Sequence, residues 1–590
     1  MGRFEALDWI AIIGYIVFAM SVGIYLTKRA SKSTDDFYLA GRSLKWWVAG
    51  TSLVATSFAA DTPLVISGWV RSSGISYNWL WWGMAVGGSL TFVVLAAWWR
   101  RLEVTTDAEF IERRYSGKPA SFLRGFYGCY HALITNTIVL TWVLLAMLKL
   151  VRVILGAEDD RYDIYIVGGG LVLALSYSFL SGLWGVVVTD LMQFVLAMLG
   201  AILLAYKSID ALGGFTAAQQ AFAGLPQSTT SIMPLANEEG LSWDSIAWWS
   251  QGFGAFFIFI GIQGWLNKNA DGGGAGVQRY SASLDENHAR KAALWFNIAH
   301  YCIRPWPWII VGLASIILLP EWGVALPVVN GAIDHEAAYP MMMAQLLGPG
   351  LFGLLCASFL AAFMSTLDTH FNLASAYLVN DVYRRFVRKE APDKHYVWVG
   401  RFAEILIGII AATFALQADS IANLFTFSLS LMGGLGPALL LRWFWRRANV
   451  FTEISALATS TILTFVTKSL GFDYPFSYMV VVLGSLVVAV SVTYVTPPAD
   501  KDTLDRFYSI IRPDEISKPH FFAAWGGGIA LIYGLLLAIG QFLLGGAFIT
   551  PLVIAVTGAI ILRLCWHKCI DPSPSSLSSI QQHSGNNMRR

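Results

Sequence analysis

The chain has 590 residues, of which 56% are hydrophobic and only 13% are charged. Soluble globular chains carry about 25% charged residues, so this composition excludes a water-facing surface and predicts a protein surrounded by lipid. A net charge of +2 argues against nucleic acid as a partner, because no basic excess is present to neutralise phosphates. The five cysteines lie in or beside apolar runs at spacings that fit no zinc site, so we expect them to be packing residues.

Apolar runs of about 20 residues, the length that crosses a bilayer, recur along the whole chain. The first run is too long for the apolar part of a signal peptide, and its one preceding basic residue is offset by a glutamate. We expect about fifteen transmembrane helices, near 7–27, 46–69, 77–99, 122–151, 163–180, 183–206, 246–267, 291–319, 345–380, 397–416, 419–444, 449–470, 475–495, 521–544 and 548–566.

Basic residues predict the orientation of these spans. If the spans alternate from an outside N-terminus, 32 of the 40 Lys and Arg residues fall on the inner side. The positive-inside rule therefore predicts a multi-pass protein of the plasma (inner) membrane with its N-terminus outside and its C-terminus in the cytoplasm. The longest outer loop covers about 208–244, and the Ser-, Gln- and Asn-rich segment 571–590 has the composition of a disordered tail.

Polar clusters inside the spans are the first functional candidates, because a polar group in hydrocarbon is costly. The first cluster, Ser52–Pro63, has the sequence SLVATSFAADTP. Its proline disfavours helix at Thr62, so we expect unwound backbone with carbonyls free to bind a cation near Ala55 and Phe58. Small residues that pack helices closely are the alternative, although packing does not require Asp61.

The second cluster, AAFMSTLDT, lies in the ninth span. Ser365, Asp368 and Thr369 share one helix face because they are spaced i, i+3 and i+4, and Ala362 lies one turn before Thr366. Hydroxyl, carbonyl and carboxylate oxygens are the ligands that a hard cation prefers. The alternative is that the hydroxyls bond back to carbonyls of their own helix.

A third cluster and a glycine-rich region complete the set. Thr189-Asp190 and Gln193 lie in the sixth span, where the carboxylate could instead pair with a basic side chain near the inner face. Four glycines fall in 251–265, and Asp271 is followed by three more. These glycines lack the strand and GK[ST] context of a phosphate loop. Two interrupted spans, about five spans apart, are typical of an inverted-repeat transporter.

The residues resemble the sodium/solute symporter family, which has the LeuT-type inverted-repeat fold. The resemblance covers roughly residues 1–450 and rests on KSTDDFYLAGRSLKWW at 32–47, TDLMQ at 189–193, VQR at 277–279, AFMST at 362–366 and NDVY at 380–383. It implies an all-α polytopic membrane protein with a five-plus-five inverted-repeat core and two broken helices. The implied parts are a leading helix and inner turn (1–45), a first repeat with its outer loop (46–245), a second repeat (246–447), trailing helices (448–570) and a cytoplasmic tail (571–590).

The resemblance also implies a sodium ion as the coupling ion. Its ligands would be three backbone carbonyls and two hydroxyls, from Ala55, Phe58, Ala362, Ser365 and Thr366. A second cation site is implied at Asp190, Ser365, Asp368 and Thr369. The family usually has a small residue at the position of Asp368, so two carboxylates would meet here. Such a pair needs a bridging sodium ion, a proton or a basic side chain.

The resemblance places the solute against Ser57, Asp61, Thr62, Tyr77, Asn78 and Trp265, stacked on Tyr77 or Trp265. Sugar carriers of the family typically have Gln or His at the position of Thr62 and an acidic residue at that of Asn78. The MST sequence and Asp61 look closer to the proline-carrying branch. We therefore expect sodium-coupled symport of a small polar solute, amino-acid-like first and a sugar or polyol second. Arg304, inside a span, could neutralise a substrate carboxylate, snorkel, or pair with a carboxylate of the protein.

Three other functions were weighed: a proton-coupled carrier on the same fold, a solute sensor, and a membrane-embedded transferase. A sensor needs a signalling domain, and a transferase needs a catalytic or metal constellation that the scattered His131, His300 and His370 do not suggest. We therefore expect no enzyme. The expected partners are a small polar solute, sodium and the lipid bilayer, with no nucleic acid and no obligate protein partner.

Overall fold

The structure is a computed structural model that describes residues 4–30, 39–57, 59–155, 160–234 and 246–569. Within these residues the chain is almost entirely helical, apart from one short antiparallel hairpin of β1 (Val328–Val329) and β2 (Ala332–Ile333). Phe58 and the expected tail 571–590 lie outside the described residues. The all-α fold class predicted from composition is confirmed.

The first part of the chain contains α1, the broken pair α3 and α4, and the long helices up to the outer loop. Its elements are α1 (Ala6–Ala30), η1 (Ala40–Arg42), α3 (Trp46–Thr56), α4 (Asp61–Ser73), η2 (Ile75–Asn78), α5 (Trp79–Trp82), α6 (Ala85–Leu90), η3 (Thr91–Leu95), α7 (Ala96–Leu102), α8 (Asp107–Arg114), α9 (Gly117–Tyr130), η4 (His131–Thr135), α10 (Asn136–Leu155), η5 (Asp160–Tyr162), α11 (Asp163–Ala211), α12 (Phe215–Ala223) and α13 (Gln227–Thr230).

The second part begins after the outer loop and carries the remaining core helices. Its helical elements are α14 (Ile246–Ser250), α15 (Gly252–Ile258), η6 (Phe259–Gln263), α16 (Ala275–Ala282), α17 (Glu286–Asn297), η7 (Ile298–Ile303), α18 (Pro305–Glu321), η8 (His335–Ala337), α19 (Ala338–Leu346), α20 (Leu351–Ala376), η9 (Tyr377–Val387), α21 (Asp393–Ala415), α22 (Ile421–Gly433) and α23 (Gly436–Phe444). The trailing elements are α24 (Val450–Ser469), α25 (Phe476–Val495), α26 (Lys501–Ile511), η10 (Pro513–Glu515), α27 (Lys518–Leu543) and α28 (Ile549–Cys565).

The predicted count of fifteen spans is not confirmed. Among the described residues, nine helices are long and apolar enough to cross a membrane, and eleven if each of two bent helix pairs counts as one span. Three further apolar helices are shorter, at Ala6–Val22, Gly252–Gln263 and Ile549–Cys565. α11 also runs as one helix where the sequence predicts two spans, since neither residue of the expected turn, Ser181-Gly182, removes a backbone donor as proline would.

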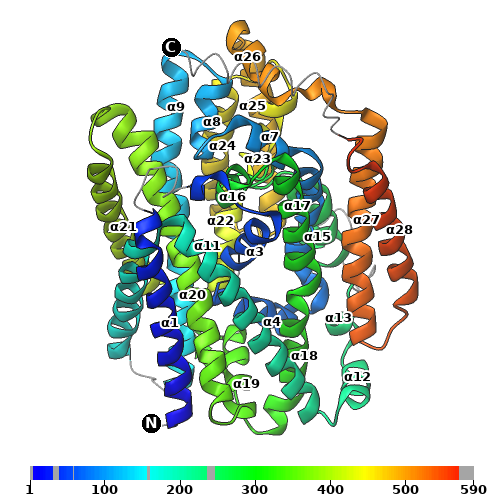
Figure 1. The fold of residues 1–590 in the computed structure, drawn as a ribbon. Coiled ribbons are helices and arrows are strands. Elements are labelled where there is room, and N and C mark those ends of the chain that lie inside the picture. Colours follow the sequence, from blue (N-terminus) through cyan, green and yellow to red (C-terminus); the bar gives the residue numbers. More distant parts are fainter. Residues whose placement is uncertain (1–3, 31–38, 58, 156–159, 235–245, 570–590) are drawn as a thin grey trace.

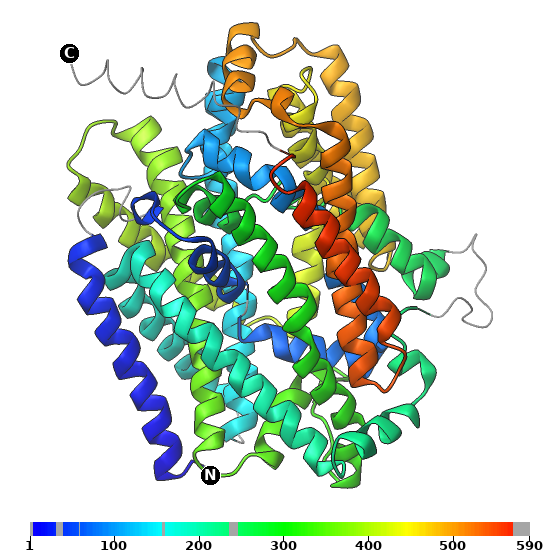
Figure 2. The ribbon, with the colours of Figure 1, turned by 45° about the vertical axis from the view of Figure 1, so that its right-hand side comes forward.

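The broken helix α3–α4 lies in the middle of the bundle (Figures 1 and 2). The two halves bend by 61° at the interruption, which confirms the break predicted from the proline-containing cluster. Pro63 is in the first turn of α4, where a missing amide hydrogen costs no helical hydrogen bond. α3 packs on α11, α17 and α20, whereas α27 and α28 lie side by side at one edge of the molecule (Figure 1).

The second interruption lies later than predicted. The sequence placed it within 246–267, but α15 and η6 are helical to Gln263, and the irregular segment covers 264–274 before α16 begins. Side chains there bond to nearby amides: Asn267 accepts from the backbone N–H of Asn269 at 2.9 Å, and Asp271 accepts from that of Gly273 at 3.2 Å. Gly272, at φ +80°, has a backbone conformation that helix does not allow. These local bonds compete with the helix and fix the break.

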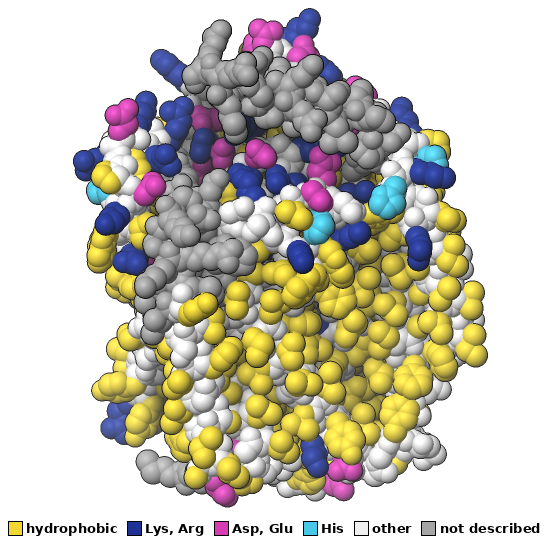
Figure 3. Space-filling model, viewed as in Figure 1, with side chains coloured by type: hydrophobic (Ala, Val, Ile, Leu, Met, Phe, Trp, Pro, Cys, Tyr) yellow, Lys and Arg dark blue, Asp and Glu magenta, His cyan; other side chains and the backbone are white. Residues whose placement is uncertain are grey.

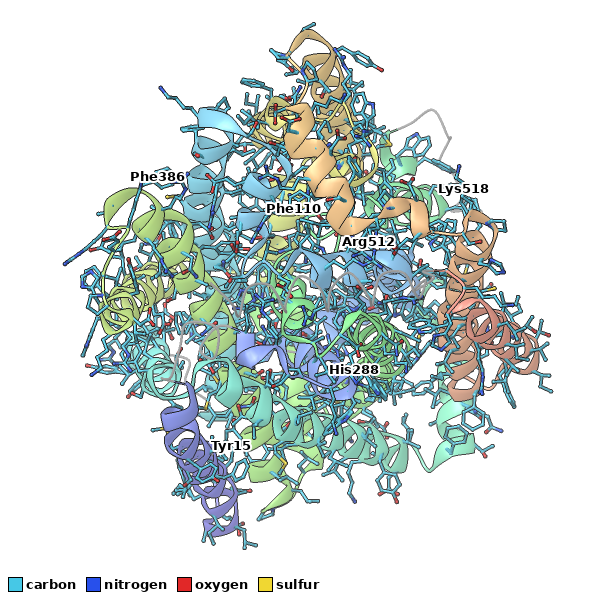
Figure 4. All side chains as sticks on the ribbon, turned by 45° about the horizontal axis from the view of Figure 1, so that its top comes forward. Tyr15, Phe110, His288, Phe386, Arg512 and Lys518 are labelled. Carbon is cyan, nitrogen blue, oxygen red and sulfur yellow. The ribbon has the colours of Figure 1, made fainter. Side chains whose placement is uncertain are left out.

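Charged side chains gather at one end of the molecule. On the face shown in Figure 3, hydrophobic side chains cover a broad band, and Lys and Arg side chains concentrate above it, toward the end where α26 lies in Figure 1. Figure 4 looks toward that end and labels Phe110, Arg512 and Lys518 there, whereas Tyr15 lies on α1, farther down the bundle. The band is the surface that a membrane would cover.

Candidate functional site

The C-terminal end of α3 and the middle of α20 meet in the interior, as the two polar clusters predict. The Thr366 hydroxyl donates to the Thr56 carbonyl at 3.3 Å, and the hydroxyls of Thr56 and Thr369 lie 3.2 Å apart. Four of the five residues predicted for the first sodium ion are buried here: Ala55, Ala362, Ser365 and Thr366. The fifth, Phe58, lies outside the described residues. Hydroxyl and carbonyl oxygens thus converge where α3 ends, which is the donor set that a sodium ion requires.

Asp190 joins α11 to both of these helices. Its carboxylate accepts hydrogen bonds from the hydroxyl of Ser52 at 2.6 Å and from that of Ser365 at 2.5 Å. Asp190 and Ser52 have no exposed surface. Ser365 therefore belongs to both predicted cation sites, and the structure brings Asp190 to the residues that the sequence grouped with it.

A guanidinium group lies among the residues predicted for the second cation. Arg279, on α16, donates to the hydroxyls of Thr56 at 2.9 Å and Thr369 at 3.0 Å, and it lies 3.7 Å from an Asp190 carboxylate oxygen. Its side chain is completely buried. Asp368, one helical turn from Ser365, also interacts electrostatically with Arg279. The sequence left three possible partners for the two carboxylates: a sodium ion, a proton or a basic side chain. In the structure, a basic side chain, that of Arg279, lies beside Asp190.

Sequence reasoning did not identify Arg279 as that partner. The residue was noted only as part of the VQR motif, and nothing in its local sequence shows which distant carboxylates it faces. The signal that could have found it is an arginine within eight helical residues of which seven are buried. A buried charge is seldom left unpaired, so this pattern calls for an acidic partner elsewhere in the chain.

A cavity of about 290 Å³ lies beside the break in α3–α4. Ser57, Asp61 and Thr62 line it, as predicted. Three other predicted solute contacts do not form its wall. Tyr77 packs edge-on against Phe259, the side-chain amide of Asn78 donates to a carbonyl in its own turn, and Trp265 packs against the ring of Trp525.

Other aromatic side chains form the cavity wall instead. They are Trp69, Trp81, Trp142, Phe296 and Phe425. His300 also lines the cavity and is stacked between two of these rings, 4.8 Å from Trp81 and 4.6 Å from Phe296 between ring centroids. The sequence treated His300 only as a scattered histidine, because one of the two rings that hold it, Trp81, comes from a distant segment.

Several residues of the wall carry buried polar atoms without a partner among the described residues. They are Asp61 Oδ1, Trp81 Nε1, Asn297 Oδ1 and His300 Nδ1. A buried polar atom left unsatisfied costs about 1–3 kcal/mol, so such atoms mark places where a ligand or water completes the hydrogen bonding. The set contains acceptors, a donor and a ring nitrogen, beside aromatic faces.

Arg304 binds the end of α3 rather than the cavity. Its guanidinium donates to the carbonyl of Val54 at 3.0 Å and to that of Ser57 at 2.7 Å. These carbonyls lose their helical partners where α3 stops, and a cation is favoured at a helix C-terminus. Arg304 also interacts electrostatically with Asp61. Of the possibilities given for Arg304, pairing with a carboxylate of the protein is closest to what the structure contains, because its partners are Asp61 and two backbone carbonyls.

The irregular segment 264–274, part of which lines the cavity, is hydrogen-bonded to other parts of the chain. Asp271 accepts from the Arg442 guanidinium at 2.6 Å and from the Trp443 indole at 2.8 Å. Asp107, a cavity residue, accepts from the Tyr377 hydroxyl and, at 3.0 Å, from the amide of Gly274. These bonds fix the position of α16, and hence of Arg279.

Known proteins similar to this chain are sodium cotransporters. A sodium/glucose cotransporter of Vibrio parahaemolyticus is 25% identical over 78% of this chain and 85% of its own length. A sodium/mannose cotransporter of Bos taurus is 28% identical over 75% of both chains. A sodium/myo-inositol cotransporter 2 of Rattus norvegicus is 25% identical over 87% of this chain and 80% of its own.

These relatives correct two finer expectations. Their names refer to sugars and inositol, so they do not support the closeness to the proline-carrying branch or the ranking of an amino-acid-like solute first. The residues that led to that ranking, the MST sequence and Asp61, belong to α20 and α4, beside the predicted sodium site.

The fold is also that of a known symporter. A solved structure of a Na⁺-coupled sialic acid symporter, in a substrate-bound outward-open state, superposes with a TM-score of 0.68 over 84% of this chain and 100% of its own, at 19% identity. The family model described as the sodium:solute symporter family matches residues 37–460. The members of this family are transporters rather than enzymes, and sodium and a solute are what they carry across the membrane. The chain belongs to the sodium:solute symporter family.

Proposed function

We propose that this protein uses the sodium gradient to carry a sugar or polyol into the cell. The main support is the cavity wall, where unsatisfied acceptor oxygens of Asp61 and Asn297, a ring nitrogen of His300 and the indole N–H donor of Trp81 lie beside aromatic rings. Hydroxyl groups both donate and accept, so a polyhydroxylated solute satisfies such a mixed set, and its C–H faces pack on the rings. The sugar and inositol cotransporters among the relatives agree with this choice.

We propose that the coupling sodium ion is held by the carbonyls of Ala55, Phe58 and Ala362 and by the hydroxyls of Ser365 and Thr366. The hydrogen bond from Thr366 to the carbonyl of Thr56 supports this site, because it brings the two segments within ligand distance of each other. Sodium binding would hold α20 against the end of α3. That contact stabilises the cavity wall that α4 begins, so the ion raises the affinity for the solute and the solute raises that for the ion.

We further propose that the protein carries one sodium ion per solute. The second cation would be the guanidinium of Arg279, which lies 3.7 Å from Asp190 and interacts electrostatically with Asp368. Its contact with Thr369 uses a hydroxyl that a second sodium ion would need. A sodium ion at the same place would meet a permanent positive charge.

The proposed orientation has the basic end in the cytoplasm and the N-terminal end of α1 outside. Figure 3 supports it, since Lys and Arg side chains concentrate at one end of the apolar band. The proposed core comprises two repeats, 46–245 and 246–447, each containing one interrupted helix, with the helices before and after them packed around it.

The test is uptake into proteoliposomes that contain the purified full chain. Radiolabelled glucose, mannose and myo-inositol are offered under an inward sodium gradient, under an equal potassium gradient, and under a proton gradient without sodium. We expect uptake of at least one of these solutes only with sodium. Uptake driven by protons alone would establish the proton-coupled alternative, and sodium-driven uptake of proline but of no sugar or polyol would contradict the proposal.

A further inference from the structure

One ionisable side chain of the cavity wall has no role in the proposed function so far. Lys268 belongs to the irregular segment 264–274 that interrupts the second broken helix, and it lines the cavity together with Asn267 and Asn269. Its ammonium group donates to the hydroxyl of Ser428 at 3.4 Å. It also lies 5.6 Å from the ring centroid of Trp142.

The ammonium group of Lys268 has a hydroxyl and an aromatic face beside it, and no acidic side chain forms a salt bridge with it in the described part of the chain. The carboxylates of the wall have other interactions. Asp107 accepts from Tyr377 and from the amide of Gly274. Asp61, another residue of the cavity wall, interacts electrostatically with Arg304.

A positive charge in the membrane interior is costly unless a counter-ion or a functional partner accompanies it. The Trp142 ring and the Ser428 hydroxyl compensate only part of this cost. Neither of them neutralises the charge. The other N–H donors of Lys268 are in a cavity that must admit a solute. The anion that would pair with the ammonium group can therefore be part of that solute.

We propose that the solute is a sugar or polyol that bears a carboxylate, and that Lys268 binds this carboxylate. The inference rests on the proposed function and specifies the solute of the same cavity. The hydroxyl groups of the solute meet Asp61, Asn297 and His300, and its acidic group meets Lys268, with the amide side chains of Asn267 and Asn269 beside it. The hydroxyl groups and the carboxylate of the solute thus match two sets of residues in the same cavity wall.

D-glucose and D-glucuronate provide a matched pair of probes, because they differ only in the group at one carbon. Each is tested in sodium, on the purified full chain, for binding and for competition with labelled uptake. Lys268→Gln removes the charge and Lys268→Arg keeps it. Lys468→Gln is the control, since Lys468 is an exposed lysine that also lies 5.6 Å from an aromatic ring, that of Phe427, away from the cavity.

We expect the unmodified protein to bind glucuronate at least about tenfold more tightly than glucose, as a charge-assisted contact requires. Lys268→Gln should lose about tenfold or more of the affinity for glucuronate and less than about threefold of that for glucose. Lys268→Arg should keep the preference, and Lys468→Gln should change neither affinity.

Three results would overturn the inference. The first is a preference of the unmodified protein for glucose over glucuronate. This measurement does not depend on whether any variant folds. The second is an equal loss of both affinities in Lys268→Gln, which would make the lysine a general donor. The third is competition by lactate as strong as that by glucuronate, which would show that the hydroxyl groups are not recognised. If no sugar, polyol or sugar acid binds in sodium, the proposed function itself fails.

Discussion

Replacing Arg279 tests whether a side chain of the protein has taken the place of a second sodium ion. Arg279→Gln removes the guanidinium that donates to Thr56 and Thr369 and that lies 3.7 Å from Asp190. Asp190 then stays buried without the guanidinium that lies 3.7 Å away, and Asp368 loses one electrostatic partner. Burial disfavours the ionised form of both carboxylates, so the variant must bind a cation, take up a proton or lose stability.

The expected magnitude follows from the burial of the group. Both partners of the Arg279–Asp190 pair have no exposed surface, and removing one partner of a buried pair costs about 3–5 kcal/mol. A sodium ion that occupies the vacated site at 100 times its Kd returns about 2.7 kcal/mol. The variant should therefore be much less stable than the unmodified protein in potassium and should recover most of the difference in sodium.

Two measurements check this expectation. Thermal unfolding of the purified variant is followed against sodium concentration, and the sodium dependence of solute uptake gives a Hill coefficient. We expect a coefficient of about one for the unmodified protein and for Arg279→Lys, and of more than one, up to about two, for Arg279→Gln. Adding Asp368→Ala to Arg279→Gln should bring the coefficient back toward one, because it removes a ligand of the new site.

The reasoning fails if the unmodified protein already has a coefficient of about two, since sodium and Arg279 would then bind side by side. It also fails if Arg279→Gln is as stable in potassium as the unmodified protein. In that case the two carboxylates need no cation.

Three further substitutions test the remaining parts of the site. Thr366→Ala should raise the sodium concentration for half-maximal uptake by about tenfold, the equivalent of roughly 1.4 kcal/mol. Thr366→Ser, which keeps the hydroxyl, should change it little. The same sodium dependence in Thr366→Ala and the unmodified protein would exclude Thr366 as a ligand. His300→Phe keeps the stacked ring but loses its nitrogens, so the KM for the solute should rise. Tyr77→Ala, outside the cavity wall, should leave KM nearly unchanged. The reverse pattern would support the solute pocket expected from the resemblance. Arg304→Gln leaves the carbonyls of Val54 and Ser57 unsatisfied at roughly 1–3 kcal/mol each, which should lower the Tm. Arg304→Lys should recover only part of that loss, because an ammonium group lacks the fork of a guanidinium. An unchanged Tm for Arg304→Gln would show that water satisfies these carbonyls.

Features that depend on neighbouring residues could be predicted from the sequence alone. Apolar runs determined the membrane class and most helices, because lipid admits only backbone that is hydrogen-bonded within its own segment. Pro63 and the small polar residues before it located the break between α3 and α4, since proline acts on the residues next to it. The helix period placed Ser365, Asp368 and Thr369 on one face and so brought together the hydroxyls that we predict to bind a cation.

Tertiary structure decided which distant groups meet. Arg279 lies 89 residues before Asp368 along the chain and 89 after Asp190, and only the packing of α16 on α3 brings its side chain to Asp190 and to Thr369 of α20. The cavity wall likewise combines rings and polar atoms from α4, α5, α10, α17 and α22, which no local pattern connects. The second break also extends beyond the span in which the sequence predicts it. The side chains of Asn267 and Asp271 accept hydrogen bonds from backbone amides that would otherwise donate within a helix. Periodicity and propensity act within a few residues, whereas the pairing of buried charges and the shape of a cavity depend on contacts between segments far apart in the chain.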